Sequence, residues 1–140
     1  DITGNTNLTI SGLNFGTKYS VRVKAVNGVG VSKVSSTLNV TTLATTPGAV
    51  AGLTSKSVTA TGAVISWVAP ANGGAKISDY KAEYSADGGN TWLTALKSAS
   101  TSTTFTLKNL KTKTSYLFRV SAKNIVGYSA PSSNLIVVTP

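Results

Sequence analysis

The sequence predicts an all-β chain: a seven-stranded antiparallel sandwich of two sheets, preceded by the C-terminal half of a second such sandwich. Three observations support this prediction. Apolar and polar residues alternate with a period of two along several short segments, which is typical of half-buried strands. Clusters of Gly, Pro and Asn separate these segments, as expected for turns. Finally, the two ends of the chain are similar to one another, which indicates an internal repeat.

The repeat appears when the chain is compared with itself at an offset of 97 positions. Residues 1–43 then align with residues 98–140 without a gap, and 17 of the 43 positions are identical. We therefore predict that residues 1–43 are the C-terminal half of one repeat, that 44–49 are a linker, and that 50–140 are a complete domain. The linker is short and contains Pro47-Gly48, so we expect the two repeats to lie end to end with limited freedom.

The strands of the complete domain are predicted in order. The first lies near residues 50–58, the second at 63–67, the third at 77–84, and the fourth after Thr91. The fifth contains Phe105 and Leu107, the sixth runs from Tyr116 to Ala122, and the seventh contains Leu135 and Val137. Alternation places Ile65 and Trp67 on the inner face, and it places Glu83 on the outer face. No segment has the period of an amphipathic helix.

The N-terminal segment repeats the pattern of the last three strands. Tyr19, Val21, Val23 and Ala25 alternate with polar residues as positions 116–122 do. Together with Leu8 and Ile10, they give apolar faces for three strands but no opposing sheet. A fragment of this size rarely folds alone. Two explanations are open: the missing strands belong to more of the same chain, or another copy supplies them, as in strand-complemented filaments.

The order of residues in the complete domain resembles that of a fibronectin type III domain. The resemblance rests on Trp67 in the second strand, Tyr80 and Tyr84 in the third, Leu110 followed six residues later by Tyr116, and an Arg-Val-x-Ala-x-Asn-x-x-Gly segment from Arg119. The Leu-x5-Tyr spacing resembles the tyrosine corner of such sandwiches, in which the hydroxyl binds upstream backbone. The resemblance implies the same structural role for Leu13 and Tyr19 in the N-terminal segment. The style of the repeats is similar to that of bacterial secreted proteins.

A second motif lies between the third and fourth strands. The segment Ser85-Ala86-Asp87-Gly88-Gly89-Asn90-Thr91-Trp92 resembles the Asp box of sialidases and other propellers. In those families the motif is a structural hairpin, which implies that Asp87 binds the turn and that Trp92 packs beneath it. We therefore interpret Asp87 and Trp92 as structural residues.

Composition excludes several kinds of chemistry. The chain has no Cys, Met or His, so disulfides and Ser-His-Asp or Cys-His catalysis are absent. It has four carboxylates, and Asp79 and Glu83 lie four residues apart on one strand, about 13 Å if the strand is extended. That spacing is too wide for a glycosidase pair, which needs roughly 5–9.5 Å. We expect no catalytic, cofactor or metal site, and no apolar run long enough to span a membrane.

The formal net charge is +9, and five of the positive residues lie close together in the sequence around the sixth strand. These candidate polyanion contacts are Lys108, Lys111, Lys113, Arg119 and Lys123. An anionic cell-wall polymer or acidic glycan is a candidate partner. The alternative is that the charge serves solubility and protects strand edges. Nucleic acid is disfavoured because most aromatic residues are predicted to point inward, although Tyr128 is expected to be exposed.

Two functions are consistent with these predictions. The first is a non-catalytic structural spacer or adhesive repeat of a large extracellular or cell-surface protein or filament, with neighbouring repeats or other copies as its partners. The alternative is an accessory module of a secreted polysaccharide-degrading enzyme whose catalytic domain lies outside this chain. Both place the protein outside the cell or on its surface. The sequence around the chain, or binding to polysaccharides, would distinguish them.

Overall fold

The computed structural model describes residue 4, residues 6–95 and residues 98–140. Within this part of the chain it has strands and no helix, as predicted, and no helix that is long and apolar enough to cross a membrane. The strands form three antiparallel sheets. Their bounds are β1 Lys18–Val21, β2 Leu38–Thr41, β3 Ala51–Thr59, β4 Gly62–Val68, β5 Asp79–Ser85, β6 Leu93–Thr94, β7 Thr104–Lys108, β8 Ser115–Lys123 and β9 Leu135–Val138.

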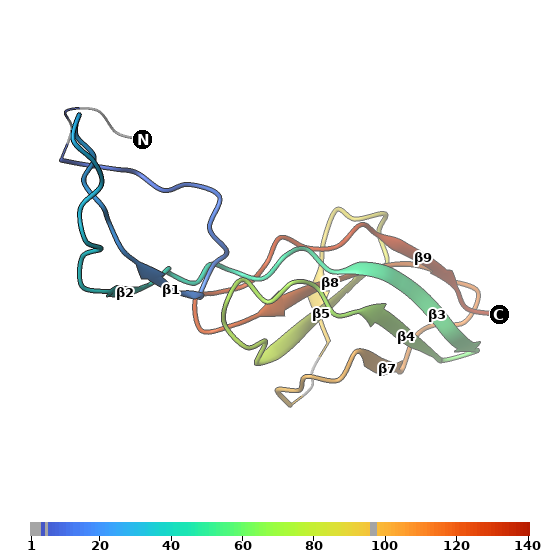
Figure 1. The fold of residues 1–140 in the computed structure, drawn as a ribbon. Helices are drawn as coiled ribbons and strands as arrows, with labels where there is room; N and C mark the ends of the chain where they lie inside the picture. Colours follow the sequence, from blue (N-terminus) through green and yellow to red (C-terminus); the bar gives the residue numbers. More distant parts are fainter. Residues whose placement is uncertain (1–3, 5, 96–97) are drawn as a thin grey trace.

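The complete domain is a sandwich of two sheets, as Figure 1 shows. One sheet has the order β3-β4-β7 and the other β6-β5-β8-β9, so the described residues of this domain form the seven strands that the sequence predicts. The two-stranded sheet β1-β2 of the N-terminal segment lies apart from both (Figure 1). The fold is therefore one whole sandwich preceded by a smaller unit.

The core lies between the two larger sheets, and the predicted inward residues form it. Trp67 of β4 and Tyr80 of β5 meet across the sandwich, with ring centroids 5.2 Å apart in an edge-on arrangement. Burying one such aromatic side chain contributes roughly 1.5–3 kcal/mol. The buried apolar residues are Val50, Ala63, Ile65, Trp67, Tyr80, Ala82, Ala95, Leu107, Leu110, Tyr116, Phe118, Val120, Ala122 and Val137.

The tyrosine corner is present in both repeats. The backbone N–H of Lys111 donates to the hydroxyl of Tyr116 at 2.9 Å, and the N–H of Asn14 donates to that of Tyr19 at 2.9 Å. Leu110, next to this corner, is buried in the core, whereas the equivalent Leu13 is half-buried. The corner thus forms in the N-terminal segment without a complete core around it.

The N-terminal segment differs from its prediction in two ways. Strand β1 ends at Val21 instead of continuing to Ala25, and the residues around Leu8 and Ile10 form no strand. In the complete domain, β8 continues to Lys123 because every residue of β5 pairs with it. The pairing begins with Asp79 opposite Lys123 and ends with Ser85 opposite Leu117. Among the described residues, β1 pairs with β2 alone, so a longer strand would leave backbone groups without partners.

Candidate functional site

The candidate site is the junction between the two repeats, and Asn124 is its central residue. Asn124 follows β8 and is 1% exposed. Its side-chain oxygen accepts hydrogen bonds from the N–H groups of Val126 at 2.9 Å and Gly127 at 3.2 Å, so the loop holds the amide group in one orientation. In the sequence, Asn124 is part of the Arg-Val-x-Ala-x-Asn-x-x-Gly pattern, which does not by itself indicate this role.

The amide nitrogen of Asn124 joins two further segments. It donates to the carbonyl oxygen of Thr45 in the linker at 2.7 Å and to that of Asn72 in the loop after β4 at 2.9 Å. One buried side chain thus uses all of its amide groups to hold the linker, the β4–β5 loop and its own loop together. Removing a partner from such a buried polar group costs about 1–3 kcal/mol.

Backbone hydrogen bonds fix the linker to the same loop. The N–H of Thr45 donates to the carbonyl of Gly73 at 2.8 Å, and that of Gly48 donates to the carbonyl of Ala71 at 2.9 Å. Gly73 has a φ of +68°, and a Cβ on it would lie 2.4 Å from the oxygen of Thr45. Only glycine allows this approach. The linker is therefore bound to the complete domain and is not a free tether.

The N-terminal segment contacts the same loop through a pair of glycines, Gly16 and Gly74. A Cβ added to Gly16 would lie 2.2 Å from the oxygen of Gly74, and one added to Gly74 would lie 2.5 Å from the carbonyl carbon of Phe15. The two backbones therefore touch with no side chain between them. Together with the Asn124 hydrogen bonds, this contact defines how the two repeats sit relative to one another.

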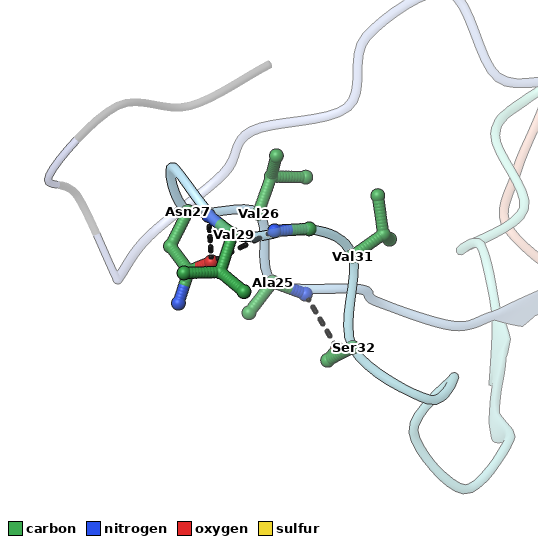
Figure 2. Close-up of a pocket in the computed structure, with 7 residues that line it drawn as sticks. Ala25, Val26, Asn27, Val29, Val31 and Ser32 are labelled. Atoms are coloured by element: carbon green, nitrogen blue, oxygen red, sulfur yellow. Dashed lines mark hydrogen bonds between the residues drawn. The ribbon is translucent and has the colours of Figure 1, made fainter.

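The N-terminal segment contains a loop that corresponds to the Asn124 loop. Figure 2 shows it: the side-chain oxygen of Asn27 accepts from the N–H groups of Val29 at 2.9 Å and Gly30 at 3.0 Å. The loop lines a hollow of about 420 Å³. Its lining residues are Ala25, Val26, Asn27, Val29, Gly30, Val31 and Ser32. The same side-chain geometry is therefore built twice in the chain.

The candidate polyanion contacts do not form one patch. Lys108 ends β7, and Lys111 and Lys113 lie in the loop that leads to β8. Lys123 ends β8, so it lies a strand length away, about 26 Å at the usual rise per residue. Arg119 lies between them and is engaged by other side chains. The structure therefore brings the first three lysines to one end of the sandwich and separates them from Lys123.

Arg119 belongs to a cluster on the outer face of the β5-β8 pair. Its Nε lies 2.9 Å from Glu83 Oε2, and Lys81 Nζ lies 3.0 Å from Glu83 Oε1. The guanidinium of Arg119 also stacks on Trp92, 3.9 Å from the ring centroid. Glu83 is on the outer face as predicted, yet it is only 8% exposed because these side chains cover it. Burial raises the pKa of Glu83, but the hydrogen bonds and the positive charges of Lys81 and Arg119 together outweigh it, so the pKa is lowered overall.

Tyr128 extends this outer face toward the junction end of β8. This residue is 43% exposed, in agreement with the sequence prediction. The ammonium groups of Lys81 and Lys123 lie 5.4 Å and 5.1 Å from its centroid. Cations at such exposed rings contribute about 0.5–1 kcal/mol each.

The Asp87 turn has the hydrogen bonds of a structural hairpin. Ser85 Oγ donates to Asp87 Oδ1 at 2.7 Å, and the N–H of Thr91 donates to the same oxygen at 2.9 Å. These bonds, first that from Ser85 and then those from Thr91, lower the pKa of Asp87 well below its ordinary value. Trp92 closes the turn by donating from Nε1 to the carbonyl of Gly89 at 3.1 Å.

These features define a class of protein: an antiparallel β-sandwich domain preceded by a segment that repeats part of its sequence and hydrogen bonding. The sequence matches the family described as "Fibronectin type III domain" over residues 1–41 and 48–138. The chain belongs to the fibronectin type III family. The two matched ranges cover nearly all of the N-terminal segment and of the complete domain.

Three similar proteins illustrate the range of the family. Cardiac-type myosin-binding protein C of Rattus norvegicus is 35% identical over 117 residues, which are 83% of this chain and 9% of that protein. Chitinase A1 of Niallia circulans is 33% identical over 146 residues, covering 98% of this chain and 19% of that protein. The crystal structure of domains A168–A170 from titin superposes with a TM-score of 0.64 at 31% identity, covering 81% of this chain and 38% of that one. The chain thus spans a small part of these relatives, and it is similar to structural repeat modules.

Proposed function

We propose that the chain is a non-catalytic spacer or adhesive repeat of a large extracellular or cell-surface protein or filament. The observation that carries this proposal is the junction, where Asn124 binds the carbonyl groups of Thr45 and Asn72. A linker held in this way gives two neighbouring repeats one relative orientation. An array of such repeats has a defined length and stiffness, and that is the property a spacer supplies.

The relatives support this proposal at the level of the module. Myosin-binding protein C and titin contain segments that are at least 31% identical to this chain over more than four-fifths of its length. In each case the chain covers less than half of the protein or fragment that it matches. This is the pattern of a module that occurs within larger proteins.

The spacer proposal is tested by measuring the distance between the repeats. The chain has no cysteine, so Thr37→Cys and Lys56→Cys provide two unique spin-label sites, both exposed and one in each repeat. Double electron–electron resonance should give one narrow distance distribution, and Asn124→Ala should broaden it. Asn90→Ala is the matched control, because Asn90 also donates to a backbone carbonyl, that of Asp87, in a hairpin outside the junction. A broad distribution in the parent chain would contradict the proposal.

A second candidate function is an accessory module of a secreted polysaccharide-degrading enzyme. The similarity to chitinase A1 over 98% of this chain favours it. Pull-down on insoluble chitin, cellulose and isolated cell wall, at low and at high salt, separates the two functions. Binding to neutral polysaccharide that does not change with salt supports the accessory role. A spacer is expected to bind neither chitin nor cellulose.

We propose separately that the basic end of the sandwich binds a polyanion. Lys108, Lys111 and Lys113 are exposed at one end of the sandwich, and this placement suits a linear anionic polymer. Replacing all three by Gln should weaken retention on a polyanion column and reduce its salt dependence. The control is the same replacement at Lys18, Lys24 and Lys33 of the N-terminal segment. Equal losses from the two triple variants would assign the binding to net charge alone.

A further inference from the structure

The loop between β4 and β5 contains a pair of residues that can modify itself. Asn72 is exposed, and it is followed by Gly73. In an Asn-Gly pair, the backbone nitrogen of the glycine can attack the side-chain carbonyl carbon of the asparagine, because glycine has no side chain that hinders the approach. Asparagine is for this reason one of the thermolabile residues of proteins.

The reaction has two steps and consumes only water. First, the nitrogen of Gly73 bonds to Cγ of Asn72, its proton passes to solvent, and the side-chain amide leaves as ammonia. The product of this step is a cyclic imide, succinimide. Water then opens the ring at one of its two carbonyl carbons. Opening at Cγ gives aspartate, whereas opening at the backbone carbonyl carbon gives isoaspartate, in which the chain continues through the former side chain.

The peptide unit that must move in this reaction is held at the junction. The carbonyl oxygen of Asn72 accepts from Nδ2 of Asn124 at 2.9 Å, and the carbonyl of Gly73 accepts from the N–H of Thr45 at 2.8 Å. The linker lies so close that a Cβ on Gly73 would be 2.5 Å from the oxygen of Thr46. Because a peptide unit is planar, the nitrogen of Gly73 approaches Cγ only if the carbonyl group of Asn72 turns with it. The closed junction therefore hinders ring closure.

Isoaspartate at position 72 does not fit the closed junction. The backbone carbonyl group of Asn72, which is an acceptor for Asn124, becomes a free carboxylate in this product. The backbone between residues 72 and 73 also becomes one carbon longer. The loop has no space for this extension, because its Gly74 touches the backbone of Phe15 and Gly16.

We propose that Asn72-Gly73 is a deamidation site that the closed junction protects, and that its conversion to isoaspartate holds the junction open. A reaction that needs local opening proceeds in proportion to the population of the open form. The site therefore records opening of the junction as a permanent covalent change. This inference rests on the proposed function, since it assigns a covalent regulation to the orientation that a spacer requires.

Two other asparagines serve as references within the same chain. Asn27 is also exposed and followed by glycine, and a Cβ on Gly28 would meet nothing within 4 Å, so the junction does not cover this pair. Asn124 is 1% exposed and is followed by Ile125, whose β-branched side chain hinders the backbone nitrogen. We expect Asn27 to convert whatever the state of the junction, and Asn124 to stay intact.

The rate of conversion is the first measurement. The parent chain and its variants are kept at mildly alkaline pH, and conversion is followed by peptide mass spectrometry, with isoaspartyl methyltransferase to distinguish isoaspartate from aspartate. Trypsin places the three asparagines in separate peptides, residues 25–33, 57–76 and 124–140. Gly16→Ala, which separates the junction, should speed conversion at Asn72 about 5- to 30-fold. Gly12→Ala is the matched control and should not, and conversion at Asn27 should be the same in all three chains.

The effect on the junction is the second measurement, with spin labels at positions 37 and 56. During storage, the broad part of the distance distribution should grow in step with isoaspartate at position 72. Asn72→Ser cannot form the ring and should keep a narrow distribution over the same period. Asn27→Ser, which blocks the reference site, should broaden as the parent chain does.

Three outcomes overturn this proposal. If Asn72 converts neither in the parent chain nor in Gly16→Ala, it is not a deamidation site. If it converts at the same rate in both, the closed junction does not protect it. If it converts and the distance distribution stays narrow, isoaspartate fits the closed junction. The spacer function fails separately, through a broad distribution in the fresh parent chain before any conversion.

Discussion

Gly16→Ala is the perturbation that tests the junction most directly. Gly16 has a φ of +58°, but conformational freedom alone does not explain the glycine, because its equivalent Lys113 has a φ of 50° and carries a side chain. What distinguishes Gly16 is its contact with Gly74. A Cβ at position 16 would lie 2.2 Å from the carbonyl oxygen of Gly74 and 2.7 Å from its Cα.

The size of the effect follows from these distances. Ordinary Cβ contacts begin at 3.4 Å, so the two backbones must separate by about 1.2 Å. The facing loop carries Gly73, which accepts from Thr45 at 2.8 Å, and the same linker residue accepts from Asn124 at 2.7 Å. Losing both hydrogen bonds costs about 2 kcal/mol in total. This free energy changes the ratio of closed to open junction by roughly 30-fold.

The assay is the distance between spin labels at positions 37 and 56. Gly12→Ala is the matched control, because Gly12 has a φ of +74° and open space around its Cβ. Both variants therefore place alanine in a left-handed conformation, at a cost of roughly 1–2 kcal/mol each. Only Gly16→Ala adds the collision with the facing loop. We expect the distance distribution to broaden for Gly16→Ala and to stay narrow for Gly12→Ala.

Two results would refute this reasoning. If Gly16→Ala keeps the parent distance distribution, the glycine pair does not hold the repeats together. If Gly12→Ala broadens the distribution equally, the effect comes from backbone strain within the N-terminal segment. The melting temperature of the complete domain is measured in parallel. It should change little in Gly12→Ala, whereas in Gly16→Ala it should fall, because Gly73 and Asn124 of the complete domain lose their hydrogen bonds to Thr45.

Three further predictions concern stability. Tyr116→Phe removes the hydroxyl of the tyrosine corner and should cost the complete domain about 1 kcal/mol, or 4–8 °C in melting temperature, whereas Tyr19→Phe should leave that transition unchanged. Because the pKa of Asp87 is lowered in the folded state, its ionised carboxylate stabilises the folded domain. This stabilisation is complete above the unfolded pKa of about 3.9 and is lost as the pH falls through the lower pKa of the folded state. Asp87→Asn should therefore reduce the fall in melting temperature that the parent chain shows at acid pH. Arg119→Gln removes one partner of Glu83, so it should lower the melting temperature and shift the fluorescence of the stacked Trp92.

The fold could be predicted from the sequence because the apolar residues that alternate along each strand are the ones that the core buries. Positions 116, 118, 120 and 122 alternate in the sequence, and all four are at most 4% exposed. The N-terminal segment was predicted less well for a related reason. Its sequence has the pattern of longer strands, but a strand also needs a neighbour, and within the described part of the chain Val23 and Ala25 have no counterpart of β5 beside them. The alternation of apolar and polar residues indicates a preference for the strand conformation, but it does not show whether a neighbouring strand is present to pair with.

The junction was missed because its chemistry lies in backbone groups. The acceptors for Asn124 are the carbonyls of Thr45 and Asn72, which every residue has, so no residue type marks them. A signal was nevertheless present in the repeat itself. Asn27 and Asn124 are identical across the offset of 97, as are Ser32 and Ser129. The burial of Glu83 was missed for a different reason: alternation correctly assigns it to the outer face, but the long side chains of Lys81 on its own strand and Arg119 on the neighbouring strand cover it there.

The two repeats have the same corner but do not offer the same contact surface. The N–H of Gly16 donates to the carbonyl of Leu43 at 3.2 Å, and that of Lys113 donates to the carbonyl of Pro140 at 3.3 Å, so the turns match. Their side chains do not, because the Cβ that Gly16 lacks is present in Lys113. A loop could not approach Lys113 as closely as Gly74 approaches Gly16. The orientation at this junction therefore depends on the contact between Gly16 and Gly74 as well as on the hydrogen bonds of Asn124.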